Sequence, residues 1–77
     1  GFAKMLNIKI VFETNKEENI KLIVSNINGQ VVNTKLIRSS LGDNSSTIDL
    51  GDYSSGFYYV TIMSDTHQLS KKFMVVK

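Results

Sequence analysis

The sequence has no cysteine, no proline and a single alanine among its 77 residues. The lack of cysteine excludes disulfides, thiolate metal ligands and cysteine nucleophiles, so a small core must hold the fold unaided. The lack of proline leaves the turns to Gly, Asn, Asp and Ser. No apolar run exceeds four residues, whereas a membrane-spanning helix needs ~20. A chain of this length forms one small domain at most.

The excess of positive over negative charge is also small. Nine Lys and Arg residues face seven Asp and Glu residues, which gives a net charge of +2. Residues 1–38 carry +3 (six basic, three acidic) and residues 39–77 carry −1 (three basic, four acidic). A single Arg38 and scattered lysines do not make the basic face with aromatic contacts that is typical of nucleic-acid binding. The charge therefore indicates a soluble surface and no nucleic-acid partner.

β-Branched residues, by contrast, are abundant. Val, Ile and Thr account for 20 of the 77 residues, and such side chains favour strands over helices. No window repeats apolar residues at helical spacing over three turns. The apolar fraction of 42% and the charged fraction of 21% are those of a globular domain and not of a disordered tail.

Apolar and polar residues alternate in six segments, which predicts strands near residues 7–13, 20–25, 30–37, 47–50, 57–63 and 69–77. Asn28 and Gly29 predict a two-residue type I′ hairpin turn, in which both residues have positive φ. Residues 39–46 are expected to form a loop and residues 51–56 a compact turn. Six or seven short strands without a helix predict an all-β fold, a small antiparallel immunoglobulin-like β-sandwich.

The same alternation predicts which side chains point into the sandwich. We expect a domain over residues 7–77, with residues 1–6 as a linker remnant or a scar of tag removal, because they fit the strand pattern poorly. Tyr53 is expected to fold back onto the core. The predicted inward residues are Val24, Val32, Leu36, Ile48, Leu50, Tyr58, Val60, Ile62, Phe73 and Val75.

Side chains that carry chemistry are few. His67 is the only histidine and lies in a polar turn, and no serine stands in a nucleophile elbow, so a Ser–His–Asp relay has no support from the sequence. Residues 44–46 (Asn-Ser-Ser) match a glycosylation acceptor, a pattern that is common by chance. The sequence predicts no catalytic residue, no metal site and no cofactor. Four residues that could offer some oxygen ligands to calcium are also ordinary turn formers: Asp43, Asn44, Asp49 and Asp52.

Three aromatic residues follow one another at 57–59, so both faces of the predicted strand carry a ring. An exposed pair such as Phe57 and Tyr59 could stack on sugar rings, as in carbohydrate-binding modules. Strands also favour aromatic residues for packing alone, which makes core and cross-strand packing the better-supported interpretation.

Four segments, taken in order, resemble the C-terminal sorting domains of the type IX secretion system of Bacteroidetes, type A. Residues 22–32 (LIVSNINGQVV) are similar to the family's hairpin, which has Asp or Asn, two residues and then Gly. Residues 46–50 (STIDL) and 53–62 (YSSGFYYVTI) follow, with Tyr53 where the family usually has Leu. Residues 70–77 (SKKFMVVK) are similar to its closing strand. The family usually has a Pro-Asn-Pro segment before the first strand, and this sequence has no proline: either it starts after that segment or this member lacks the segment.

The resemblance implies a non-catalytic signal that directs an attached passenger across the outer membrane to the cell surface. The domain would pass through the periplasm and be read by outer-membrane translocon and sortase components. Exposed strand edges would support recognition, and in isolation they would also favour a homodimer or a strand swap. The alternative is an immunoglobulin-like structural or carbohydrate-binding module of a secreted enzyme. The resemblance assigns the sorting motif to Asn26, Gly29, Val32, Gly56, Tyr58, Lys71, Lys72, Phe73, Val75 and Lys77.

Overall fold

The computed structural model describes residues 6–77, and this part of the chain forms strands and no helix. Residues 1–5, which belong to the segment expected to be a remnant, lie outside the described part. Every pair of neighbouring strands is antiparallel, which confirms the all-β prediction. The six strands are β1 (Asn7–Thr14), β2 (Asn19–Asn26), β3 (Val31–Arg38), β4 (Gly42–Asp49), β5 (Gly56–Met63) and β6 (Gln68–Val75).

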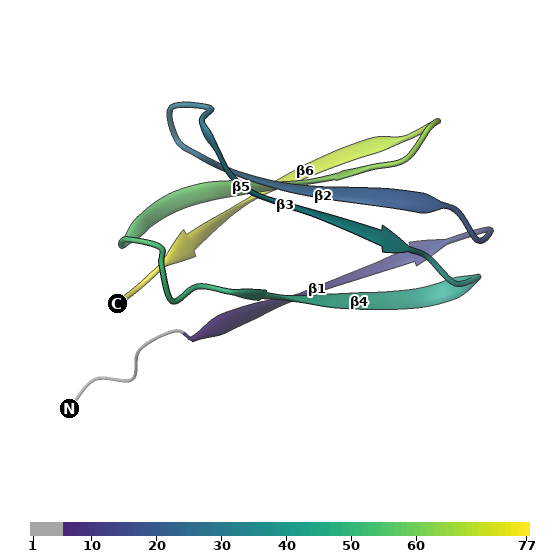
Figure 1. Ribbon diagram of the computed structural model, residues 1–77, viewed down its shortest axis with the longest axis horizontal. Helices are drawn as coiled ribbons and strands as arrows, with labels where there is room; N and C mark the ends of the chain where they lie inside the picture. The colour runs from purple at the N-terminus through teal and green to yellow at the C-terminus, as the bar shows by residue number, and fades with distance from the viewer. Residues whose placement is uncertain (1–5) are drawn as a thin grey trace.

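The strands form two sheets of unequal width that face each other (Figure 1). One sheet contains only β1 and β4, and the other has four strands in the order β3-β2-β5-β6. Because neighbouring strands lie about 4.8 Å apart, a two-stranded sheet cannot cover a four-stranded one. The start of β1 and the C-terminus lie at the same end of the sandwich (Figure 1), where the Leu50 N–H donates to the Leu6 carbonyl over 3.0 Å.

The core lies between the two sheets. Alternate residues of β2 and β5 supply one side of the core, and Ile48 and Leu50 supply the other. Phe73 and Ile62, both predicted to be buried, are only half-buried. Tyr53 packs against this core, as expected. The buried apolar side chains are Ile20, Leu22, Val24, Ile48, Leu50, Tyr58, Val60 and Val75.

The prediction of which β3 side chains point toward the core is wrong. Val32 and Leu36 were expected to point inward, yet they are 42% and 76% exposed. Residues directly opposite each other in an antiparallel pair share a face, and the buried Val24 lies opposite Asn33. Asn33 and Lys35 therefore occupy the inner face of this edge strand, and the Lys35 ammonium donates to the Thr47 carbonyl of the facing sheet over 3.3 Å.

The predicted loop at residues 39–46 is also wrong in its second half, because β4 begins at Gly42. This half of β4 is polar and shows no apolar alternation. It is a strand because its main chain pairs with β1 along the whole length of both strands, from Asn7 opposite Asp49 to Thr14 opposite Gly42. The inward position at Ser46 is filled by a small hydroxyl side chain that is 8% exposed.

The turn between β2 and β3 differs from the predicted type I′ turn. Gly29 has φ of 83°, whereas no residue other than glycine has positive φ in the described chain, so Asn28 does not adopt the second left-handed position. The Asn26 N–H donates to the Gln30 carbonyl over 2.9 Å, and the Gly29 N–H donates to the Asn26 carbonyl over 3.0 Å. These bonds close a three-residue loop with one left-handed residue at its end, the second commonest way to join two strands.

Candidate functional site

Most residues of the predicted sorting motif come together at one end of the sandwich. Asn26, Tyr58 and Phe73 lie side by side across β2, β5 and β6. Gly56 lies opposite Val75, two positions further along the same pair of strands. We name this region the motif end and define it as residues 26–30, 50–58 and 73–77. Figure 1 shows that the β4–β5 turn and the C-terminus lie near each other at this end, and that the β2–β3 turn projects from the same end of the sandwich.

Asn26 organises the β2–β3 turn through its side chain. Its Oδ1 accepts hydrogen bonds from the main-chain N–H groups of Asn28 and Gln30, each over 3.0 Å. Its Nδ2 donates to the Gln30 Oε1 over 3.1 Å. Only an oxygen acceptor on a short side chain can reach both N–H groups, and both Asn and Asp offer one. The Asn-x-x-Gly spacing of the motif therefore encodes this turn, with Gly29 at the left-handed position.

Tyr58 ties the motif end to the core. Its hydroxyl donates to the Ser54 carbonyl over 2.7 Å, and its side chain is only 6% exposed. The ring lies 5.1 Å from the Tyr53 ring and 5.8 Å from the Phe73 ring, measured between centroids. Aromatic rings at such distances attract each other beyond simple burial. The motif residues Tyr58 and Phe73 thus pack between the two sheets and are not presented on the surface.

Lys77 is fastened to the turn that follows β4. Its main-chain N–H donates to the Ser55 Oγ over 3.1 Å. Its Nζ donates to the carbonyls of Leu50 and Gly51. Val75, two residues earlier, is 1% exposed. The closing residues therefore form part of the fold and do not hang free.

Lys71 and Lys72 are not brought together, because neighbouring residues of a strand point to opposite faces. Lys72 lies on the outer face of β6, where its Nζ is 4.5 Å from the centroid of the Phe57 ring. Lys71 lies opposite Val60 on the inner face and is nonetheless exposed. Lys72 therefore touches the motif end only from the outer face, through the Phe57 ring, and Lys71 and the exposed Val32 of β3 lie outside it.

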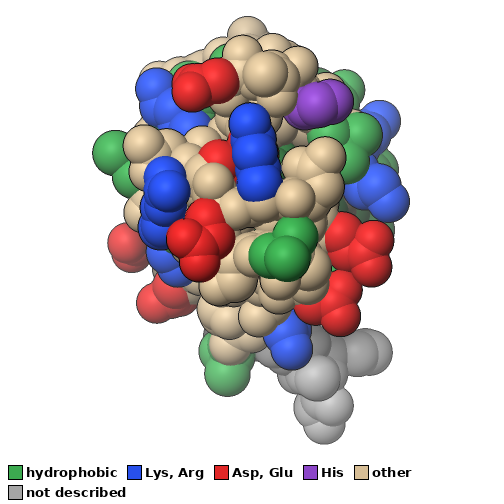
Figure 2. Space-filling model, turned by 90° about the vertical axis from the view of Figure 1, so that its right-hand side faces the viewer, with side chains coloured by type: hydrophobic (Ala, Val, Ile, Leu, Met, Phe, Trp, Pro, Cys, Tyr) green, Lys and Arg blue, Asp and Glu red, His purple; other side chains and the backbone are tan. Residues whose placement is uncertain are grey.

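Charges of both signs are spread over the surface. Figure 2 views the end of the molecule opposite the motif end, and Lys and Arg side chains alternate there with Asp and Glu. Charges of a single sign do not gather on this face. One ion pair, Lys16 Nζ to Glu18 Oε2 at 3.7 Å, lies at the β1–β2 turn.

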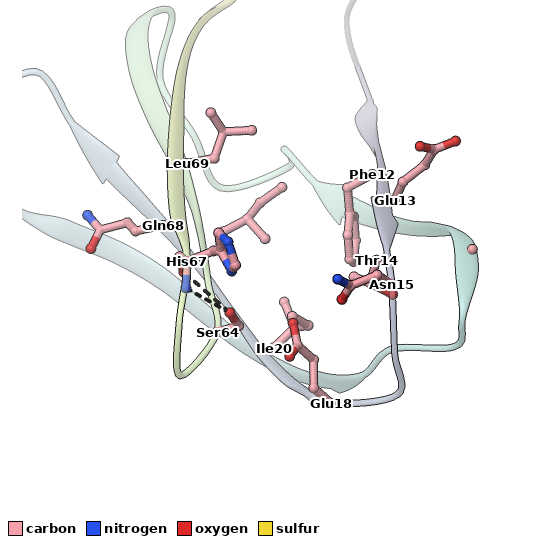
Figure 3. A pocket seen from close by; sticks show the side chains of 12 residues that line it. Phe12, Glu13, Thr14, Asn15, Glu18, Ile20, Ser64, His67, Gln68 and Leu69 are labelled. Carbon is pink, nitrogen blue, oxygen red and sulfur yellow. Dashed lines mark hydrogen bonds between the residues drawn. The ribbon is translucent and has the colours of Figure 1, made fainter.

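A hollow with a volume of about 700 Å³ also lies toward this opposite end. Phe12 and Thr14 of β1 line one side, and His67 and Leu69 of the β5–β6 hairpin line the other, with Ile20 at its base (Figure 3). Most of its surface is apolar, although most of the residues that line it are polar. It contains no constellation of nucleophile, base and oxyanion donors that would indicate catalysis.

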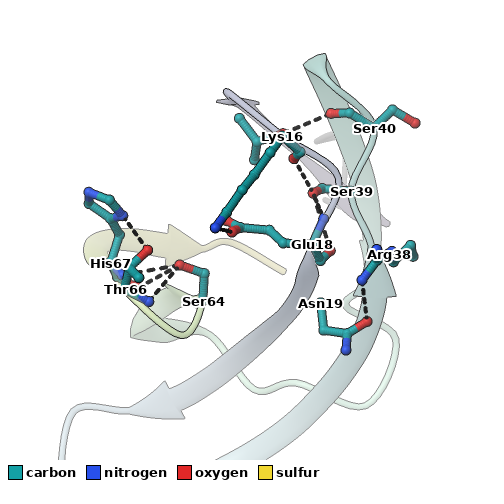
Figure 4. A network of polar contacts seen from close by, with 10 residues as sticks. Lys16, Glu18, Asn19, Arg38, Ser39, Ser40, Ser64, Thr66 and His67 are labelled. Carbon is teal, nitrogen blue, oxygen red and sulfur yellow. Dashed lines mark hydrogen bonds and ion pairs between the residues drawn. The ribbon is translucent and has the colours of Figure 1, made fainter.

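The alternatives that need chemistry at His67 or at a carboxylate cluster find no support. The Ser64 Oγ accepts from the main-chain N–H groups of Thr66 and His67, which holds the turn closed (Figure 4). The His67 Nδ1 shares a hydrogen bond with the neighbouring Thr66 hydroxyl over 2.8 Å. Among residues 6–77, no three His, Cys, Asp or Glu side chains gather closely enough to hold a metal ion. The same residues include no helix that could cross a membrane.

Two polar residues have structural roles that the sequence did not reveal. The Asn44 side chain donates to the carbonyls of Ser40 and Gly42 and accepts from the Ser40 N–H, so the amide of the glycosylation match is already engaged. The Ser39 Oγ, in a side chain that is 2% exposed, accepts from the Glu18 N–H over 3.0 Å and joins the β3–β4 connection to the β1–β2 turn (Figure 4). A buried hydroxyl with several partners cannot be recognised from residue type alone.

The comparisons with known proteins agree with the motif. A family model described as "Secretion system C-terminal sorting domain" matches residues 3–76, which is nearly the whole chain. No curated protein and no solved structure matches the chain. Domains of this family are non-catalytic signals of type IX secretion, and the proteins that carry them are secreted or displayed at the cell surface. The chain belongs to the secretion-system C-terminal sorting domain family.

Proposed function

We propose that this chain is a sorting domain of type A, and that an outer-membrane translocon reads it through strand β6 and the motif end. Recognition by secretion machinery follows from membership of the family. We add to this an outer-membrane translocon, a sortase and the residues that they contact. One observation carries it: most motif residues converge on a single end of the fold. These residues are Asn26, Gly29, Gly56, Tyr58, Phe73, Val75 and Lys77.

The contacts divide the motif into two groups of residues with different roles. Asn26, Gly29, Tyr58 and Phe73 make internal contacts, so they fix the shape of the motif end. What remains accessible is β6, which pairs with β5 on one side only and so has a free edge. A free edge offers main-chain N–H and C=O groups for strand addition. The exposed Lys71 and Lys72 would add charge to that edge.

The experiment fuses the chain to the C-terminus of a secreted reporter in a host with type IX secretion. The double variant Lys71→Ser and Lys72→Ser is compared with the double variant Lys16→Ser and Lys21→Ser, which removes two lysines away from β6. We expect both variants to fold, because exposed charges contribute under ~1 kcal/mol. Surface delivery should fall only in the β6 variant. Equal delivery by both variants would contradict a role for the β6 lysines, and failure of the unmodified fusion would contradict the sorting function itself.

A second candidate function, carbohydrate binding, rests on the outer face of β5. Phe57 and Tyr59 point to the same side of the sheet and are 44% and 36% exposed. The Lys72 ammonium already lies over the Phe57 ring, so Tyr59 is the ring left for a sugar. Glycan binding that is lost in Tyr59→Ala and kept in Tyr53→Phe would support this candidate. No glycan binding by the unmodified chain would exclude it.

A further inference from the structure

The sandwich is closed at the motif end and opens along β6. On the inner face of β6, Val75 is 1% exposed and Phe73 is half-buried, whereas Lys71 is exposed and Leu69 is 58% exposed. An apolar side chain on the inner face of a sheet is normally covered by the facing sheet. Nothing in the described chain covers Leu69, because the facing sheet has no third strand beyond β1.

The space beside β1 is a continuous groove. Two hollows of about 700 Å³ and about 410 Å³ adjoin each other and share Phe12, Glu13, Ile62 and Leu69 in their walls. One wall is β1, which pairs with β4 on its other side and leaves this edge unpaired. In an antiparallel strand, alternate residues turn their N–H and C=O groups toward each edge. The groove thus combines an apolar floor with a row of free main-chain groups.

We propose that this groove binds one extended segment of a partner protein, which adds to β1 as an antiparallel third strand. Main-chain hydrogen bonds to β1 would supply affinity, and alternate apolar side chains would fill the floor over Ile62 and Leu69. All strand pairs in the fold are antiparallel, and antiparallel pairing is the more stable form. The site is separate from the motif end and does not depend on the function proposed above.

The charges at the groove specify the order of charges in the partner segment. Lys9 and Lys71 line one part of the groove. Glu13 lies where the two hollows adjoin, and Glu18 lines the larger one, although Lys16 already pairs with Glu18. Four residues separate Lys9 from Glu13 along β1, about 13 Å in a strand. A segment antiparallel to β1 therefore needs a basic residue first and an acidic residue four positions later.

A second copy of the chain is the obvious competitor, since β1 itself carries Lys9 and Glu13 in this order. The charges of two β1 strands would match across a two-fold axis. The widths of the sheets oppose this arrangement, because β6 extends beyond β1 in each copy. In a symmetric β1–β1 pair each β6 would take the space of the other copy's wider sheet. A single strand from another protein meets no such obstacle.

The test uses the 77-residue chain and a synthetic capped peptide, Val-Lys-Ile-Thr-Ile-Glu-Val. We expect a Kd in the range of ~10–500 μM, as for a short segment that gives up its freedom on binding. Hydrogen exchange should slow at those β1 amides that do not bond to β4. The same peptide with both Ile nitrogens methylated loses main-chain donors and should bind at least ~10-fold more weakly. Exchange of its Lys and Glu should also weaken binding.

Two variants of the chain locate the peptide. Leu69→Glu places a charge on the groove floor and should weaken binding at least ~10-fold. Met74→Glu is the matched control, since Met74 is 49% exposed on the opposite face of the same strand, and it should bind like the unmodified chain. The proposal is overturned if no peptide binds at ~1 mM, if the methylated peptide binds equally well, or if Met74→Glu is the variant that loses binding. A chain that instead dimerises through β1 would also overturn it.

Discussion

Gly29 shows how a single backbone angle can decide a motif position. Its φ of 83° lies in the left-handed region, and a Cβ added there would meet no atom within 4 Å. Any loss of stability on substitution therefore comes from backbone strain and not from a steric clash. Gly29→Val should lower the free energy of unfolding by ~1–3 kcal/mol, and Gly29→Asn should lower it less, because Asn tolerates this conformation. Urea unfolding measures both; an unchanged midpoint for the valine variant would contradict the loop described here.

Tyr53 carries a buried hydroxyl that no partner satisfies. Burial raises the pKa of Tyr53 above 10.0, and the nearby Asn33 side chain opposes this shift without completing a hydrogen bond to the hydroxyl. A folded-state pKa above the unfolded value means that the neutral tyrosine is favoured by folding. Its contribution to stability is complete below pH ~10 and is lost as the pH rises from there toward the folded-state pKa.

Tyr53→Phe should therefore keep or raise the stability at pH 7, by up to ~1 kcal/mol, since it removes an unsatisfied buried group. It should also reduce the loss of stability above pH 10. The matched control, Tyr59→Phe, changes an exposed ring and should retain the alkaline loss of the unmodified chain. Urea unfolding at pH 7 and at pH 10.5 distinguishes these outcomes. An alkaline loss that is the same in all three proteins would show that Tyr53 does not cause it.

At the scale of the element, β6 is an edge strand whose two faces differ. Phe73 stacks on Tyr58 and is half-buried, so Phe73→Ala should lower the free energy of unfolding by ~2–3 kcal/mol, less than the ~3–5 kcal/mol of a fully buried ring. Met74→Ala, on the outer face, should lower it by under ~1 kcal/mol. Thermal unfolding of the two variants compares the faces directly. Equal losses would mean that the register of β6 against β5 is shifted by one residue.

The elements differ in how well the sequence predicts them. β2 and β5 are predicted well because they are central strands and bury their apolar side chains. β3 is an edge strand with a polar inner face, so choosing Val32 and Leu36 as inward residues placed the wrong face toward the core. β4 was missed over its polar half because it depends on main-chain pairing with β1, which leaves no trace in side-chain alternation.

The motif residues at the candidate site came from the family resemblance, but their roles needed the fold. The Asn26 acceptor acts within a local turn, whereas the hydrogen bonds of Lys77 join residues that are brought together only by folding. The groove beside β1 could not be predicted at all, because it depends on the relative widths and positions of the two sheets. Residue types indicate most of the strands, whereas the lateral offset of the sheets follows only from how all six strands pack.

For the whole molecule, the C-terminal residues should matter more for stability than their number suggests. Removal of residues 75–77 deletes the buried Val75 and the hydrogen bonds that Lys77 makes to Leu50 and Gly51. A domain of this size has a small stability margin of ~5 kcal/mol. We expect the truncated chain to be largely unfolded at 37 °C by circular dichroism, whereas Lys77→Ala should remain folded with a lower Tm. A truncated chain with the Tm of the full chain would contradict this.

The positions of the chain ends have a mechanical consequence. Leu50 bonds to Leu6 through its N–H and to the Lys77 ammonium through its carbonyl, so Leu6 and Lys77 lie at the same end of the fold. A pulling force applied between a passenger attached before Leu6 and secretion machinery that holds Lys77 would act across the strands and not along them. Hydrogen bonds under such a load break one after another, like a zipper, whereas bonds loaded in shear must break together. β1 would peel from β4 at low force, and pulling alone could dismantle the domain without cleaving the chain.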